Sequence, residues 1–170
     1  ENSLYTVEAF RQYFEHLNPE GMVAITRWEF REPREALRVI SVATEALHQL
    51  GVSNPARHFI VVSEGPLDED GIPVVVLAKK SPFTREEEQV VTNHLGSHDN
   101  LNALYLPSSP TNNPFSALIA SNNPWAFAQS YPYNVAPVTD NDPFFFFTLK
   151  TSQILNDEGL QQGIDWKVNL

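Results

Sequence analysis

Two apolar runs joined by a brief acidic loop constrain the fold of this chain more than any other sequence feature. Residues His58–Ser63 and Ile72–Ala78 are rich in valine and isoleucine, as β-strands are, and Leu67–Gly71 between them carries three carboxylates. A crossover between parallel strands needs about a dozen residues or more. The short connection therefore predicts that the two strands pair antiparallel.

Helical periodicity surrounds this pair of strands. Apolar residues recur every three or four positions over Thr6–Leu17 and again over Leu37–Leu50, where Gly51 is suited to end the helix. Thr6 is a suitable N-cap for the first helix. A capping box, Thr84-x-x-Glu87, predicts another helix that runs to about Leu95.

One more strand is predicted at Met22–Thr26, a nearly all-apolar run typical of a strand buried on both faces. The order is then helix, strand, helix, strand, strand, helix. It favours an α/β domain with a buried parallel sheet and an antiparallel strand near its end. A sheet of three strands is thin, and its unpaired edge makes a homodimer a candidate assembly.

The composition changes after Leu106. Seven of the chain's 13 prolines lie in 107–143, among asparagine pairs and many large apolar residues. This mixture predicts an ordered, irregular Pro/Asn-rich cap, with short helices at Phe115–Ala120 and Trp125–Gln129. We therefore divide the chain into an α/β part (1–106), a cap packed on the same domain (107–149) and a polar tail (150–170).

Charge and composition exclude several classes of function. Eleven basic and 21 acidic residues give a net charge of −10 and a pI near 4.8, which disfavours nucleic acid as a partner and tolerates a cationic small molecule. Without cysteine the chain has no disulfide and no thiolate metal site. No apolar run approaches the ~18 residues of a membrane span.

Two histidines, His94 and His98, are four residues apart near the end of the helix predicted from Thr84. A zinc-protease motif would have Glu after the first histidine, where this chain has Leu95. We expect exposed helix-end histidines and no bound metal; a small metal-dependent hydrolase that uses this pair is a further alternative.

The stretch Asp140-Asn141-Asp142-Pro143 followed by four phenylalanines has two interpretations. It is a turn leading into a buried segment, or its two carboxylates contact a cationic ligand beside a large apolar surface. Arg27 and Trp28 follow the first predicted strand, where loops of α/β proteins usually hold ligands, or they simply pack at the sheet edge. The chain has no G-x-S-x-G and no G-x-G, so a serine hydrolase and an intact dinucleotide site are not supported.

Several short phrases, in order, resemble spermidine-synthase-like proteins, and more narrowly the bacterial branch in which such a domain is fused to membrane-spanning segments. The resemblance covers about residues 1–147. The phrases that carry it are Leu4–Phe10, His16–Met22, Thr26–Trp28, Pro33–Leu37, Lys80–Thr84 and Val138–Phe144.

The resemblance implies a partial Rossmann-like methyltransferase fold, of which this chain supplies the C-terminal half. It would contain the fifth strand, its helix, and the sixth and seventh strands as a hairpin. The family's Gly-rich nucleotide turn, ribose-holding acidic residue and catalytic aspartate lie upstream of the matching helix and have no counterpart here. The partner so implied is the N-terminal half of the same protein, and the location is a cytoplasmic-type soluble domain, which in this branch belongs to an inner-membrane protein.

For function, the resemblance implies a lobe of an aminopropyltransferase- or methyltransferase-like enzyme that is inactive alone and has no catalytic residue of its own. S-adenosylmethionine or its decarboxylated form would be bound by the full-length family, not by this chain alone. The candidate substrate-binding residues are Tyr5, Trp28, Asp140 and Asp142. The alternative is a degenerate methyltransferase-like module that binds a partner or a cationic metabolite without catalysis.

Overall fold

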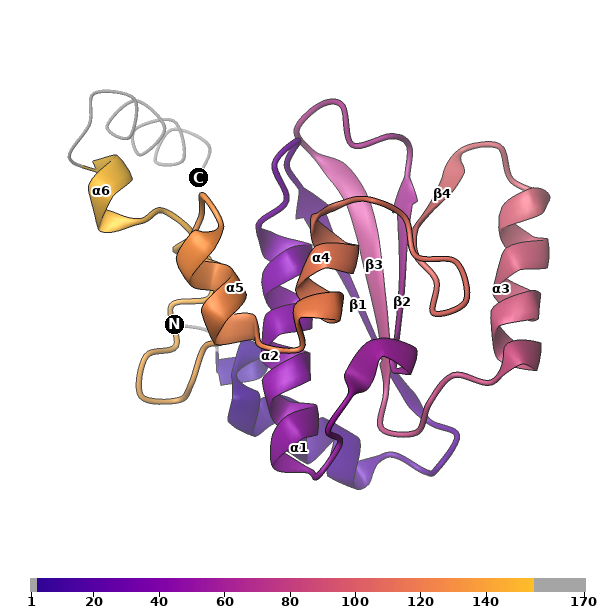
Figure 1. The fold of residues 1–170 in the computed structure, drawn as a ribbon, viewed down its shortest axis with the longest axis horizontal. Helices are drawn as coiled ribbons and strands as arrows, with labels where there is room; N and C mark the ends of the chain where they lie inside the picture. Colours follow the sequence, from indigo (N-terminus) through magenta and orange to yellow (C-terminus); the bar gives the residue numbers. More distant parts are fainter. Residues whose placement is uncertain (1–2, 155–170) are drawn as a thin grey trace.

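The computed structural model describes residues 3–154, which form a four-stranded sheet with helices on both of its faces (Figure 1). The strand order is β1-β3-β2-β4, and every neighbouring pair is antiparallel. Strands β1 and β2 therefore point the same way, with β3 between them. The strand bounds are β1 (Met22–Glu29), β2 (Phe59–Glu64), β3 (Ile72–Lys79) and β4 (Leu101–Tyr105).

This sheet confirms the predicted hairpin and corrects the predicted parallel sheet. After the short loop, β3 returns along β2 and also pairs with β1, so it separates the two strands that run in the same direction. Strand β4 was not predicted from the sequence, and it adds a further antiparallel neighbour to β2. The described residues are mixed α/β as predicted, but a Rossmann-like fold is not confirmed.

The helices begin and end at the signals found in the sequence. The Thr6 hydroxyl accepts a hydrogen bond from Ala9 N, and both halves of the Thr84–Glu87 capping box are formed. Gly51 follows the second long helix with a φ of +88°, which favours glycine. The helices are η1 (Ser3–Tyr5), α1 (Val7–His16), α2 (Glu35–Gln49), η2 (Pro55–Arg57), α3 (Arg85–Gly96), α4 (Pro114–Ser121), α5 (Pro124–Ser130) and α6 (Thr151–Ile154).

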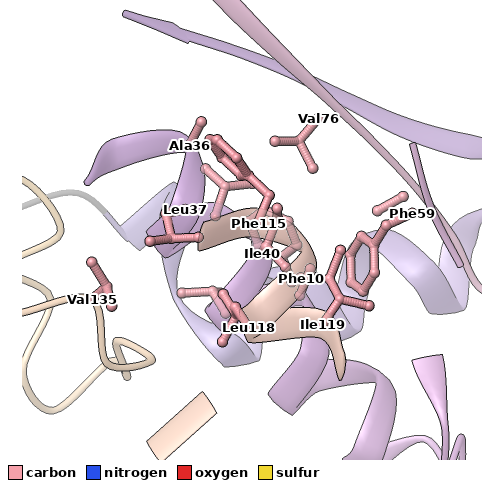
Figure 2. Close-up of a cluster of buried hydrophobic side chains, with 14 of the residues drawn as sticks. Phe10, Ala36, Leu37, Ile40, Phe59, Val76, Phe115, Leu118, Ile119 and Val135 are labelled. Atoms are coloured by element: carbon pink, nitrogen blue, oxygen red, sulfur yellow. The ribbon is translucent and has the colours of Figure 1, made fainter. Parts of the chain in front are cut away.

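One face of the sheet carries the main core. Helices α1, α2 and α4 pack together there, and α2 lies against β1 and β3 (Figure 1). Figure 2 shows this core, in which Phe10 of α1, Ile40 of α2, Phe59 of β2 and Leu118 of α4 are fully buried. The predicted cap helices are present as α4 and α5, each capped by an asparagine followed by proline.

The opposite face carries only α3 among the described helices (Figure 1). The buried apolar cluster under it is small: Ile60, Val62, Phe83 and Leu106. Two ion pairs fix the start of the helix, Lys79–Glu87 at 2.6 Å and Arg57–Glu88 at 2.9 Å.

Strand β1 corrects the expectation of a strand buried on both faces. Its residues alternate, and Met22 and Trp28 on the α3 side are 42% and 64% exposed. The run of apolar residues was misleading because β1 is an edge strand that α3 does not cover.

The predicted polar tail begins with α6, and its remaining residues, 155–170, lie outside the described part of the chain. Among the helices of residues 3–154, none combines the length and the apolar character needed to cross a membrane.

Candidate functional site

A cluster of aromatic and charged side chains lies near the carboxyl end of β1. Arg27 donates from Nε to the Glu35 carboxylate at 2.9 Å and from Nη1 to the Tyr5 hydroxyl at 3.5 Å. Burial opposes the charge on the guanidinium, but the hydrogen bonds and charge of Glu35 outweigh it and raise the pKa of Arg27. We call Tyr5, Arg27, Glu35, Phe145 and Phe146 the Tyr5 cluster.

The aromatic rings of this cluster surround the guanidinium. Arg27 Cζ lies 5.6 Å from the centroid of Tyr5 and 4.8 Å from that of Phe146. Tyr5 in turn stacks on Phe145 at 4.5 Å. Because Phe146 is 47% exposed, the cluster presents an aromatic surface to solvent. Beneath this surface lies the Arg27 guanidinium, whose charge is balanced by Glu35.

Arg38 of α2 fixes the phenylalanine turn that completes the cluster. Arg38 is 5% exposed, and its guanidinium donates to the carbonyls of Phe144, Phe145 and Phe147 at 3.1, 2.7 and 2.8 Å, and to that of Ala136 at 3.0 Å. Burial lowers the pKa of Arg38 to about 10, while the charge of Asp142 acts in the opposite direction. The turn buries Phe145 and leaves the other three phenylalanines about half exposed.

The two aspartates of the candidate site lie in a loop beside α1. The Asp140 amide donates to the Glu8 carboxylate of α1 at 3.1 Å, and the Asp142 amide donates to the Thr139 carbonyl at 3.0 Å. Both side chains are exposed. The backbone of this stretch therefore forms a turn, as one of the two interpretations predicted. The carboxylates of Asp140 and Asp142 are accessible to solvent near the Tyr5 cluster.

Trp28 does not join the Tyr5 cluster. It follows Arg27 directly, and successive side chains of a strand point to opposite faces. Its cross-strand partner is Pro73, whereas Arg27 is opposite Val74, a residue of the main core. Of the four predicted substrate-binding residues, the fold brings Tyr5, Asp140 and Asp142 to one region and leaves Trp28 on the α3 side of the sheet.

The backbone amides at the start of α2, directly after β1, bind the carboxylate of Glu29, a residue of the same chain. Glu29 is 1% exposed, and its side chain accepts hydrogen bonds from the amides of Phe30, Arg34, Glu35, Ala36 and Leu37. Burial raises the pKa of Glu29, and these amides oppose the rise. The helix terminus that could bind an external anion is therefore already satisfied.

The described residues do not fit an S-adenosylmethionine-type cofactor. The chain has no Gly-rich turn to approach a nucleotide, and the α2 terminus at the carboxyl end of β1 is filled by Glu29. Any such cofactor would have to be held by residues other than those that the structure describes.

The two histidines considered as metal ligands face each other at the end of α3, with ring centroids 4.2 Å apart. Both are exposed, and His98 Nδ1 lies 2.8 Å from the carbonyl of His94. Within residues 3–154, no group of three or more His, Cys, Asp or Glu side chains could hold a metal ion.

A shallow groove of about 400 Å³ lies between α5 and the segment 134–151. Its apolar walls include Trp125, Phe147 and Leu149. The ammonium of Lys150, which also lines it, already donates to the carbonyls at the end of α5. The groove therefore offers apolar contact without a free charge to orient a ligand.

Sequence reasoning noted Arg27 but did not place it in the site, and it missed Glu35 and Arg38. The signal for Arg38 was its place in the helix, directly after Leu37 in a run of buried positions, where an arginine needs many acceptors. No local sequence pattern predicted the pairing of Arg27 with Glu35, because this pairing depends on how α2 packs over β1.

Comparisons with known proteins identify no relative of this chain. The chain matches no protein-family model, and no curated protein or solved structure was found to be similar to it.

Proposed function

We propose that this chain is the C-terminal lobe of a spermidine-synthase-like, S-adenosylmethionine-type transferase domain, and that it is inactive alone. The observation that carries the proposal is the unit β1–α2–β2, in which a helix joins two strands that point the same way. Such units build doubly wound α/β domains. The β2–β3 hairpin agrees with the sixth and seventh strands implied by the sequence resemblance.

The position of the Tyr5 cluster supports a role in binding substrate. Doubly wound domains bind ligands beyond the carboxyl ends of their strands, and Arg27 lies near that end of β1. The lobe would supply one wall of the site, with the Tyr5 and Phe146 rings as an aromatic surface and the carboxylates of Asp140 and Asp142 favouring a cationic amine. Glu35 keeps Arg27 from repelling that amine.

The test compares the complete polypeptide in which these residues occur with its Tyr5→Ala variant. Calorimetry should show that the complete polypeptide binds a diamine, and that Tyr5→Ala weakens binding about tenfold, the equivalent of about 1.4 kcal/mol. Tyr13→Phe, a change to another tyrosine of the same region, should leave the affinity unchanged. Equal affinity of the wild type and Tyr5→Ala would contradict the proposed wall.

A second candidate function, a degenerate binding module, is favoured by the absence of any G-x-G in the 170 residues. The two candidates differ in what the complete polypeptide binds. Binding of a sulfonium nucleotide supports the transferase, and diamine binding without any nucleotide binding supports the module. Aminopropyl or methyl transfer by residues 1–170 alone would contradict the proposal that this lobe is inactive.

A further inference from the structure

Half of one sheet face is left without a covering helix in the described part of the chain. The side chains of Met22, Ala24, Thr26 and Trp28 on β1 point to the α3 side, because Met22 is opposite Lys79, whose ammonium reaches Glu87 of α3. Next to them on β3 lie Pro73, Val75 and Leu77. We call these seven residues the open face.

Helix α3 borders the open face but does not cover it. Glu87 points toward β3 and β1 through Lys79, whereas Glu88 contacts Arg57 and the Ser108 amide near β2 and β4. By helical periodicity, Val90 lies three residues after Glu87 and therefore on the same flank of α3. Val90 is 69% exposed, so an apolar residue borders the open face without a partner among the described residues.

The free edge of β1 lies beside the open face. In residues 3–154, the eight residues of β1 pair with β3 and with no other strand. β1 carries two inward-pointing charged residues, Arg27 and Glu29, but they lie on the main-core face and leave the backbone N–H and C=O groups of the free edge available to another strand. Edge and face together form one continuous uncovered surface, which extends the apolar cluster under α3 through Val75 and Leu77.

A second copy of the chain does not fit this edge. Helix α1 packs mainly on α2, and its sheet contacts are with β1, so it lies on the side of α2 away from β3. Helices pack about 8–10 Å apart and strands about 4.8 Å apart, which puts α1 over the space next to the free edge. In a symmetric β1–β1 pairing, the α2 helix of the second copy would need that same space.

The charges around the open face restrict its occupant further. Glu20 borders it, because its carboxylate lies 3.6 Å from the Lys79 ammonium, and its side chain is 81% exposed. The nearest ammonium, Lys79, is fully buried and already paired with Glu87. An element docked beside α3 therefore meets a carboxylate at its flank and apolar side chains beneath it.

We infer that a strand and an amphipathic helix from the other half of the same domain dock here, the strand on the edge of β1 and the helix over the open face. This inference rests on the proposed function for the source of the two elements. One helix is about two strands wide, which matches the uncovered width of β1 and β3. The flank of the helix that faces Glu20 carries Lys or Arg.

Cysteine labelling tests the inference, because the natural chain has no cysteine. In the complete polypeptide, the single thiol of Thr26→Cys is expected to react at least tenfold more slowly than that of Gln89→Cys, on the exposed side of α3. Unchanged thermal unfolding establishes that both variants are folded. Equal rates would overturn the inference, as would protection of Thr26→Cys that disappears on dilution, which indicates a second copy.

Two further measurements test the basic flank of the docked helix and the proposed function separately from the docking. Adding Glu20→Lys should speed labelling of Thr26→Cys, and an unchanged rate would overturn the basic flank. If Thr26→Cys is protected but no diamine or sulfonium nucleotide binds, the proposed function fails and the docking holds. If both ligands bind but Thr26→Cys is unprotected, the docking is wrong.

Discussion

The two faces of the sheet differ in how they are closed. On one, α1, α2 and α4 bury a continuous apolar core in which Phe10, Phe59 and Phe115 have no exposed surface. On the other, a single helix rests on a four-residue cluster and is held at its start by two ion pairs. The first face is stabilised by packing; the second depends on a few polar contacts and is open over β1.

The largest expected effect contrasts the same substitution on the two faces. Leu118→Ala, in the main core, should lower the free energy of unfolding by about 3 kcal/mol because it leaves a cavity among buried neighbours. Leu95→Ala, on the partly exposed inner side of α3, should cost less than about 1 kcal/mol. Urea titrations of both variants measure the difference, and equal losses would show that the faces are packed alike.

The next effect concerns the ion pair that fixes α3. Glu87→Ala removes the nearer of the two carboxylates paired with the buried Lys79 and half of the capping box, and should cost about 2 kcal/mol. Lys79→Met added to this variant should restore part of the loss, because it removes the buried charge. If chemical denaturation shows no recovery in the double variant, the unpaired ammonium is not the cause.

A smaller effect depends on pH. Burial lowers the pKa of His58, whose Nδ1 lies 3.0 Å from the Lys79 carbonyl. The unfolded state therefore binds a proton more readily, so the stability due to neutral His58 is present above pH ~6.5 and is lost as pH falls through the lower folded pKa. In urea titrations between pH 8 and 5, His58→Gln should lose less stability than the wild type. If His58→Gln and the wild type lose the same stability, other titrating groups cause the loss.

The smallest effect is expected on the open face. Trp28→Ala should change the free energy of unfolding of residues 1–170 by less than about 0.5 kcal/mol, because the side chain is 64% exposed. In the complete polypeptide the same substitution should cost several times more. A large loss already in residues 1–170 would mean that Trp28 packs within this chain.

The sequence was informative wherever structure depends on neighbouring residues. The Thr84–Glu87 capping box and the short β2–β3 loop act within a few positions, and each predicted its element. The Asn-Pro starts of α4 and α5 also act locally but were interpreted only as part of a Pro/Asn-rich cap. The sequence failed for strand order, because the insertion of β3 between β1 and β2 depends on distant pairing. β4 was missed because Leu101–Tyr105 is short and only partly buried.

The candidate site was predictable only in part, for a related reason. Tyr5, Asp140 and Asp142 come to one region because loops distant in sequence pack around α1. Trp28 was assigned with them although the two-residue period of a strand already sends it away from Arg27. The acceptors of Arg38 lie about a hundred residues away, beyond any local pattern.

Amide hydrogen exchange along β1 tests most directly whether this edge and face are incomplete. In residues 1–170, the β1 amides that do not donate to β3 should exchange rapidly, while those of the interior strand β3 are protected. In the complete polypeptide, all the amides of Met22–Glu29 should become protected, as in an interior strand. Rapid exchange of the same β1 amides in the complete polypeptide would contradict the account.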